Sequence, residues 1–308
     1  MRQGLLSHLV LALKGAAMGV ADTVPGVSGG TVAFVTGIYE ELVASLARIG
    51  PARLVDLKTG GVRRFWYEIN GNFLLSVFGG LLIALFAVAE LMNWLLTHHR
   101  ILLWGFFFGL ILASVPLVLA RLKRWHPSLT FWLALGVAVG LGITLLGPGS
   151  TPDALWMIFL AGFIAISAMV LPGISGSFLL LLMAKYETMV GAVVERELLT
   201  IFVFALGALV GVLSVARLLA ALFRRHHDAT VAVLTGFMLG SLNALWPWQY
   251  GLGQRGGLAA HHWPWRFEEA AGQAPQIGAV MLAFMAGIGL IAMFWSAETA
   301  RRRRDQVI

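Results

Sequence analysis

A stretch of twenty residues occurs twice in this chain, and the duplication limits the folds open to it more than any other feature. The copies are residues 21–40, ADTVPGVSGGTVAFVTGIYE, and residues 168–187, AMVLPGISGSFLLLLMAKYE. A single offset of 147 positions pairs their proline, their glycines, a serine and a final Tyr-Glu dipeptide. Shared apolar composition would not preserve polar residues at fixed positions, so the pattern indicates an internal duplication.

The duplicated stretches belong to a strongly apolar chain. Hydrophobic residues make up 59% of it and charged residues 12%, against about 45–50% and about 25% in soluble domains. A membrane-spanning helix needs about 20 apolar residues. Ten runs of this kind lie at residues 5–20, 27–47, 73–97, 101–120, 129–146, 155–171, 174–194, 198–222, 229–247 and 276–296. No soluble domain fits between them, so the sequence predicts an all-α polytopic membrane protein.

The basic residues predict an orientation, because cytoplasmic loops carry an excess of lysine and arginine. Alternating the loops puts fifteen basic residues on one side: Arg2, Arg48, Arg53, Lys58, Arg63, Arg64, Arg121, Lys123, Arg124, Arg224, Arg225 and Arg301 to Arg304. The other side has four: Arg100, Arg196, Arg255 and Arg266. Both termini are therefore expected to be cytoplasmic. The net charge of +7 therefore reflects basic residues in the loops and does not indicate a nucleic-acid-binding site.

The proline and glycines of each copy are expected to break a helix and turn the chain. Irregular backbone inside a membrane needs surrounding protein or a water-filled cavity. The sequence therefore predicts two re-entrant helical hairpins, each followed by three transmembrane helices. The first repeat, 1–150, has hairpin 5–47 and helices 73–97, 101–120 and 129–146; the second, 151–308, has hairpin 155–194 and helices 198–222, 229–247 and 276–296. Charge counting does not distinguish re-entrant hairpins from full crossings.

Either version has an odd number of crossings per repeat, so the second repeat is expected to be inverted. The two Pro-Gly tips can then meet near the membrane midplane, where inverted-repeat transporters place their substrate sites. The duplication continues as Gly105-Phe-Phe-Phe-Gly109 and Gly236-Phe-Met-Leu-Gly240, now at an offset of 131. The sixteen additional residues of the first repeat fall in a basic loop, 48–72. The other long loop, 248–275, carries Trp248, Tyr250, Trp263 and Trp265, which are expected at the membrane interface.

A helix that starts just after each motif presents unpaired backbone N–H groups and the positive end of its dipole. Two such ends at the midplane would bind a phosphate or a carboxylate. The alternative is that small residues here only permit close helix packing, but broken helices in both repeats favour the anion site. The candidate binding residues are Asp22, Pro25, Gly26, Ser28, Gly29, Gly30, Thr31, Pro172, Gly173, Ser175, Gly176 and Ser177.

Ionisable residues within apolar runs are costly to bury and are candidates for function. Lys14 and Arg217 are expected to line the same cavity, where one or the other offsets an anion's charge. Glu40 and Glu187 are candidates for ion coupling, because the 147-residue offset pairs them, whereas Asp22 faces Met169. Glu40 can instead lie at the interface, where long side chains reach water.

Enzymatic alternatives are disfavoured. The segment Gly26-Val-Ser28-Gly-Gly30 matches a nucleophile elbow, but that elbow requires an α/β sheet, which this chain lacks. An intramembrane serine protease needs a buried histidine base, and only His8 lies within an apolar run. Neighbouring histidines on a helix do not share a face, so no metal site is expected. The absence of cysteine excludes thiolate chemistry, and without a nucleotide motif no cofactor is expected.

Three segments make a family resemblance specific: Met18-Gly-Val-Ala-Asp-Thr-Val-Pro-Gly-Val-Ser-Gly-Gly-Thr31, Gly37-Ile-Tyr-Glu40 and Ala168-Met-Val-Leu-Pro-Gly-Ile-Ser-Gly-Ser177. The chain resembles, over nearly its whole length, the bacterial polyprenyl-phosphate transporters, long catalogued as a membrane domain of unknown function. The resemblance implies a flippase that returns undecaprenyl phosphate from the outer to the inner leaflet of the cytoplasmic membrane. That lipid carries precursors of peptidoglycan and other cell-wall polymers.

Two other classes remain open at this stage. An ion or small-anion channel could use the same crossed hairpins, since helix ends at the midplane would serve it equally well. A structural membrane scaffold gives no reason for helix-breaking motifs in both repeats. The sequence leaves open whether the protein forms a homo-oligomer and which ion, if any, drives transport.

Overall fold

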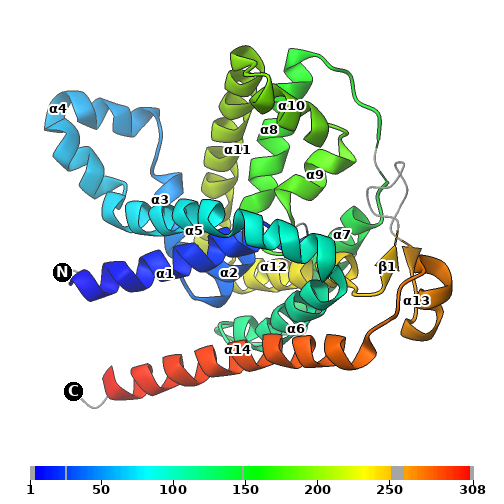
Figure 1. The fold of residues 1–308 in the computed structure, drawn as a ribbon. Coiled ribbons are helices and arrows are strands. Elements are labelled where there is room, and N and C mark those ends of the chain that lie inside the picture. The colour runs from blue at the N-terminus through cyan, green and yellow to red at the C-terminus, as the bar shows by residue number, and fades with distance from the viewer. Residues whose placement is uncertain (1–3, 25, 148, 251–259, 306–308) are drawn as a thin grey trace. The chain divides into compact units, whose positions relative to one another are not determined.

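A computed structural model describes residues 4–24, 26–147, 149–250 and 260–305 of the chain (Figure 1). Six helices are long and apolar enough to cross a membrane, and two bent helix pairs raise the number to eight if each pair is one span. The six spans are α1 (Leu5–Asp22), α5 (Gly71–His98), α6 (Arg100–Leu119), α11 (Leu198–Arg225), α12 (His227–Ser241) continued by the short helix η1 (Leu242–Leu245), and Ile277–Ser296 of α14 (Ile277–Asp305). The predicted all-α polytopic membrane fold is confirmed.

The chain forms two compact units, and each unit draws on both halves of the sequence. The first unit comprises residues 1–92 and 147–230, and the second comprises residues 93–146 and 231–308. Segments from before and after the predicted repeat boundary therefore fold together. The division into repeats 1–150 and 151–308 describes the duplication of the sequence, and it stays a prediction.

In the first unit, both copies of the motif produce the same succession of one longer and two short helices. The first copy gives α1, α2 (Gly29–Val35) and α3 (Tyr39–Ala47); the second gives α8 (Leu155–Val170), α9 (Gly176–Leu182) and α10 (Tyr186–Val194). The first break contains Gly26 in one copy and Gly173 in the other. Their φ angles, 90° and 85°, are similar, and a side chain would be strained at either position.

A second break follows the seven-residue helix of each copy, α2 or α9. The sequence did not predict it. Gly37 and Ala184, again 147 positions apart, have φ angles of 78° and 51°. The chain bends there by 118° between α2 and α3 and by 105° between α9 and α10. The expected hairpins 5–47 and 155–194 are thus three-helix segments with two breaks each.

Glycine contacts in the first unit repeat at equivalent positions. A Cβ on Gly15 of α1 would lie 2.0 Å from Val77 O of α5, and one on Gly162 of α8 would lie 2.2 Å from Phe204 O of α11. Only glycine permits backbones to approach this closely, as small residues commonly do between membrane helices. The duplication therefore extends from the motif to the packing of the helices around it.

In the second unit, the last apolar helix of each half of the sequence packs against a helix from the other half. A Cβ on Gly109 of α6 would lie 2.2 Å from Phe284 O of α14, and one on Gly240 of α12 would lie 2.5 Å from Val137 O of α7 (Ser128–Thr144). Gly109 and Gly240 are related by the 131-residue offset, and their contact residues, Val137 and Phe284, are related by the 147-residue offset. Because helices of each half of the sequence pack against helices of the other, neither half forms a compact unit of its own.

The two long connections are more structured than expected. Residues 48–72 contain a helix, α4 (Pro51–Glu68), with a kink at Gly61, whose φ is 72°. The 248–275 connection contains the paired strands β1 (Gln249–Tyr250) and β2 (Ala260–His261) and the helix α13 (Pro264–Ala271).

The tryptophans of the second connection take different positions. Trp263 and Trp265 are exposed and stack with ring centroids 5.2 Å apart, which suits the predicted interface. Trp248 packs inside the protein, and its placement at the interface stays a prediction. It is buried against Phe267 and Val280, because its indole N–H donates to Pro275 O and its ring completes a small apolar core.

Candidate functional site

The two copies of the Pro-Gly motif are in direct contact within the first unit. Ser28 Oγ donates to Met169 O at 3.0 Å, and Gly173 N donates to the Thr31 hydroxyl at 2.8 Å. Ser28, Thr31 and Ser175 are all buried. Polar groups at this depth need partners, and here each copy supplies partners for the other. The candidate site therefore lies where the two motifs join.

At the N-terminus of α2, the chain already provides an anion. Gly29 N donates to Asp22 Oδ1 at 2.6 Å, and Gly30 N donates to Ser28 Oγ at 3.1 Å. A Cβ on Gly29 would lie 2.5 Å from Asp22 Oδ2, so the carboxylate requires a glycine there. Asp22 and Ser28 thus cap the helix and neutralise the positive end of its dipole.

The N-terminus of α9 is built differently. Ser175 precedes this helix but does not cap it, and its hydroxyl lies 2.9 Å from the Ser177 hydroxyl. The position equivalent to Asp22 is Met169, whose Cγ would lie 2.6 Å from a Cβ on Gly176. One motif therefore holds a carboxylate, and the other holds two hydroxyls beside a thioether.

The remaining predicted residues of the motif lie within the same turns or outside the described residues. Gly26, Pro172 and Gly173 are buried in the two turns. Pro25 lies outside the described residues.

The two predicted cationic residues contact other parts of the first unit. Lys14 Nζ donates to Thr36 O at 2.7 Å, at the C-terminal end of α2. Arg217 Nη2 donates to Ile49 O at 2.6 Å, in the link between α3 and α4. Cations stabilise the carbonyl end of a helix, and Lys14 does so at the second break.

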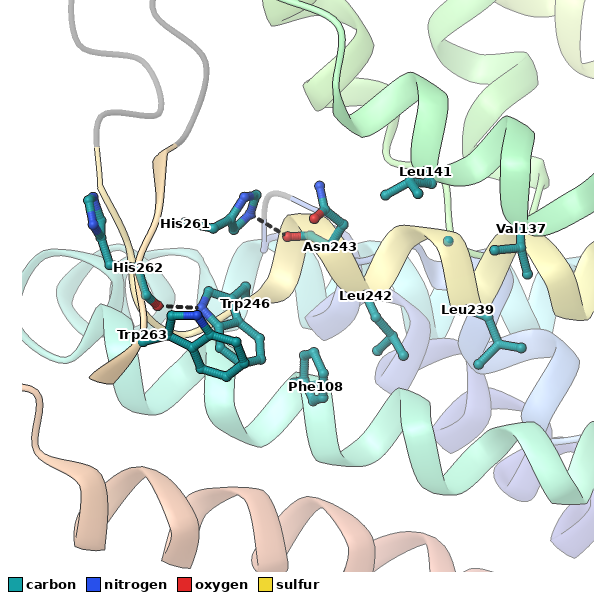
Figure 2. Close-up of a pocket in the computed structure, with 11 residues that line it drawn as sticks. Phe108, Val137, Leu141, Leu239, Leu242, Asn243, Trp246, His261, His262 and Trp263 are labelled. Carbon is teal, nitrogen blue, oxygen red and sulfur yellow. Dashed lines mark hydrogen bonds between the residues drawn. The ribbon is translucent and has the colours of Figure 1, made fainter. Parts of the chain in front are cut away.

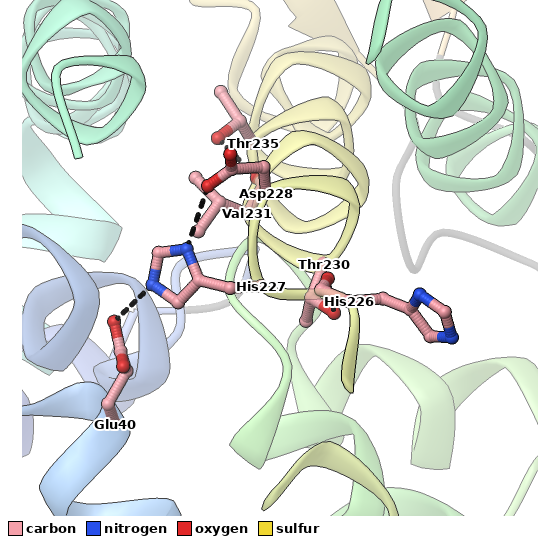
Figure 3. A network of polar contacts seen from close by, with 7 residues as sticks. All are labelled: Glu40, His226, His227, Asp228, Thr230, Val231 and Thr235. Carbon is pink, nitrogen blue, oxygen red and sulfur yellow. Dashed lines mark hydrogen bonds and ion pairs between the residues drawn. The ribbon is translucent and has the colours of Figure 1, made fainter. Parts of the chain in front are cut away.

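Glu40 belongs to a polar network that the sequence did not predict (Figure 3). His227 Nε2 lies 3.1 Å from Glu40 Oε1, and His227 Nδ1 lies 2.9 Å from Asp228 Oδ1. Figure 3 shows His226 pointing away from both carboxylates. Glu187, the equivalent of Glu40, is exposed on α10.

The sequence alone does not single out His227. Its direct neighbour Asp228, at the start of an apolar run, was the available signal. The network joins the first half of the chain to the second.

Ser28 and His8 are not paired with each other for nucleophilic catalysis. Ser28 Oγ donates to a backbone carbonyl, whereas His8 Nδ1 lies 3.1 Å from the Ser76 hydroxyl. A nucleophile requires a base within hydrogen-bond reach. The contacts of Ser28 are those of a helix cap that also links the two motifs.

The second unit contains a separate cavity of about 480 Å³ (Figure 2). Its walls are mainly apolar, with Phe108, Leu239 and Leu242 among them, and its polar end is formed by Asn243 and His261. His261 Nε2 donates to Asn243 O at 2.9 Å. A cavity of this kind can hold a hydrocarbon chain, but it shares no residue with the motifs.

Comparisons with known proteins bear on what this arrangement does. A family model described as undecaprenyl phosphate translocase-like matches residues 18–257, a range that includes both motifs. A polyprenyl-phosphate transporter of Vibrio cholerae is 40% identical over 294 residues, which cover 93% of this chain and 96% of that protein. A polyprenyl-phosphate transporter of Staphylococcus aureus is 35% identical over 254 residues, 76% of this chain and 85% of that protein. No solved structure matches the chain.

Proposed function

Because the chain belongs to the undecaprenyl phosphate translocase-like family, we propose that it is a flippase for undecaprenyl phosphate. It returns this carrier lipid from the outer to the inner leaflet of the bacterial cytoplasmic membrane, with both termini in the cytoplasm. The names of the two relatives support polyprenyl phosphate as the substrate. The proposal keeps the two inverted repeats, with re-entrant hairpins that expose the site to one leaflet at a time.

The observation that carries the proposal is the direct contact between the two motifs, through Thr31 with Gly173 and Ser28 with Met169. A lipid phosphate has an anionic head that needs donors, while its tail can stay in hydrocarbon. The protein therefore needs only one polar site for the head. The serine hydroxyls and glycine N–H groups of the joined motifs supply such donors inside the membrane, where few others exist.

The phosphate replaces contacts that the protein makes with itself. In the described conformation, Asp22 holds Gly29 N–H and Ser28 holds Gly30 N–H. A phosphate entering from the side of Ser175 and Ser177 reaches the uncapped end of α9 first. It then displaces the Asp22 carboxylate from α2, because two anions on one helix end repel each other. Asp22 therefore controls access to the second half of the site.

Coupling is assigned to Glu40 with its partner His227. The His227 ring lies between two carboxylates, 3.1 Å from Glu40 Oε1 and 2.9 Å from Asp228 Oδ1. The network connects α3 to the start of α12, so a change in its charge acts on the element that follows the first motif. Glu187 has no equivalent histidine contact in the described residues and is the weaker coupling candidate.

The test is transbilayer movement of a labelled polyprenyl phosphate in proteoliposomes that contain only this protein. The variant Ser175→Ala with Ser177→Ala removes both hydroxyls at the uncapped helix end, and we expect at least about a tenfold loss of transport, typical of lost charge-assisted hydrogen bonds. The control Ser114→Ala removes a buried hydroxyl of α6 that bonds only to Leu110 O within its own helix. Its transport should match that of the wild type.

Two further controls separate the alternatives. A neutral polyprenol should not move, because it lacks the phosphate. Chloride flux without lipid movement would show that the protein is an anion channel on the same fold and not a flippase. Equal transport by the double variant and the wild type would remove the hydroxyls of α9 from the site.

A further inference from the structure

A polar cavity of about 1100 Å³ lies beside α4 in the first unit and shares no residue with the motifs. Its lining includes three arginines, Arg48, Arg63 and Arg64, and the side chains of Trp66 and Asn72. We propose that this cavity binds the phosphate monoester headgroup of an isoprenoid lipid at the membrane surface. The inference rests on the proposed function only for the choice of an isoprenoid tail.

Charge is the first argument. None of the lining residues is acidic and three of them are arginines. The Glu41 carboxylate, which is not part of the lining, accepts from Asn70 Nδ2 at 2.9 Å. Arginine presents a planar fork of donors that matches phosphate oxygens. A monoester headgroup carries up to two negative charges and three terminal oxygens, compared with one charge on a phosphodiester. The cavity therefore favours the monoester.

The arginines come from two elements that converge. Arg48 directly follows α3, and its Nη1 donates to Glu68 O at the end of α4 at 3.4 Å. Arg63 and Arg64 lie on α4 just after its kink at Gly61. Trp66 Nε1 donates to Asn72 Oδ1 at 2.8 Å, which ties α4 to the start of α5. The cavity is thus fixed by contacts among α3, α4 and α5.

The surface of α4 indicates that this cavity opens toward lipid headgroups. The helix is not among those long and apolar enough to cross a membrane. It exposes Val62 and Tyr67, at 71% and 85%, next to its exposed arginines. Apolar and aromatic side chains beside arginines are typical of a helix that lies in the membrane interface.

The second half of the chain has no equivalent of α4. There α10 is joined to α11 by only three residues, Glu195, Arg196 and Glu197, which carry a net negative charge. The positive-inside rule puts the arginines on the cytoplasmic side. The cavity therefore serves one leaflet only, as a docking site for the lipid phosphate where it arrives in the cytoplasmic leaflet.

The experiment is photolabelling of the full-length protein in nanodiscs with a geranylgeranyl phosphate that carries a diazirine, followed by peptide mapping. Labels on residues 60–72 report this cavity, and labels on residues 21–40 and 168–187 report the motifs. Arg63→Gln with Arg64→Gln should reduce labelling of 60–72 about tenfold, because it removes charge-assisted contacts, and should leave motif labelling intact. The matched control, Arg224→Gln with Arg225→Gln, changes two exposed arginines at the end of α11 and should alter neither.

Three outcomes would overturn the proposal: undiminished labelling of 60–72 in the Arg63/Arg64 variant, equal labelling by the neutral geranylgeraniol probe, or competition by phosphatidylglycerol as strong as by unlabelled monoester. The last would assign the cavity to bulk phosphodiester lipids. Failure of the proposed function would look different, because lipid transport in proteoliposomes would be absent while labelling of 60–72 still depended on the arginines.

Discussion

At the N-terminus of α2, Asp22 occupies the place where the phosphate of the proposed substrate would bind. Its Oδ1 accepts from Gly29 N–H at 2.6 Å. Asparagine keeps the shape and the carbonyl acceptor of the side chain but removes its charge. Without the competing anion, we expect Asp22→Asn to bind geranylgeranyl phosphate about tenfold more tightly, a gain of about 1.4 kcal/mol.

Equilibrium binding to the purified protein measures this effect. Asp22→Ala is the control, because it removes the charge together with the acceptor of Gly29 N–H. A lost helix cap costs about 1 kcal/mol, so Asp22→Ala should also lower the unfolding temperature, whereas Asp22→Asn should leave it nearly unchanged. If Asp22→Asn bound the phosphate more weakly than the wild type, Asp22 would be a ligand-supporting residue and not a competitor.

Among the elements, the close approach of α1 and α5 requires glycine at the positions where their backbones cross. A Cβ on Gly80 would lie 1.9 Å from Ala12 O, whereas a Cβ on the neighbouring Gly79 would meet no atom within 4 Å. Gly80→Ala should therefore destabilise the protein by about 1–3 kcal/mol through overpacking. Gly79→Ala should be neutral or stabilising by up to about 1 kcal/mol, because alanine favours a helix.

Thermal unfolding in detergent compares these neighbours on one helix. The second repeat offers the same test, since a Cβ on Gly207 of α11 would lie 2.0 Å from Phe159 O of α8. Similar losses for Gly80→Ala and Gly207→Ala would show that the two pairs are energetically equivalent. A Gly80→Ala variant as stable as Gly79→Ala would contradict the close backbone approach.

For the whole molecule, the sequence predicted the features that depend on local residue types, namely the helical segments and the first break in each motif. Proline, glycine and apolar runs led to ten helical segments, and the first breaks at Gly26 and Gly173 follow from the conformational freedom of glycine. The second break is harder, because Ala184 adopts a positive φ that its residue type does not indicate. The carboxylate of Asp22 accepts from a backbone N–H seven residues later, and the network around His227 joins residues 187 positions apart. Periodicity and composition specify neither contact.

The pairing of helices was also beyond the sequence, because an apolar helix face does not say which partner covers it. The structure packs α6 against α14 and α7 against α12 in the second unit, and α2 contacts α8 in the first. Each of these contacts joins the first half of the chain to the second. A half expressed alone would leave these apolar and glycine-lined faces uncovered.

Cutting the chain at the predicted repeat boundary tests this exchange. We expect fragments 1–150 and 151–308 to be degraded or to aggregate when each is expressed alone, and to form a stable one-to-one complex when they are coexpressed. The reason is that both compact units need helices from both fragments. Copurification through a tag on one fragment, with thermal unfolding of the complex, measures the result. Two fragments that fold separately and do not associate would mean that each repeat closes on itself, and that the pairings of α6 with α14 and of α7 with α12 do not hold.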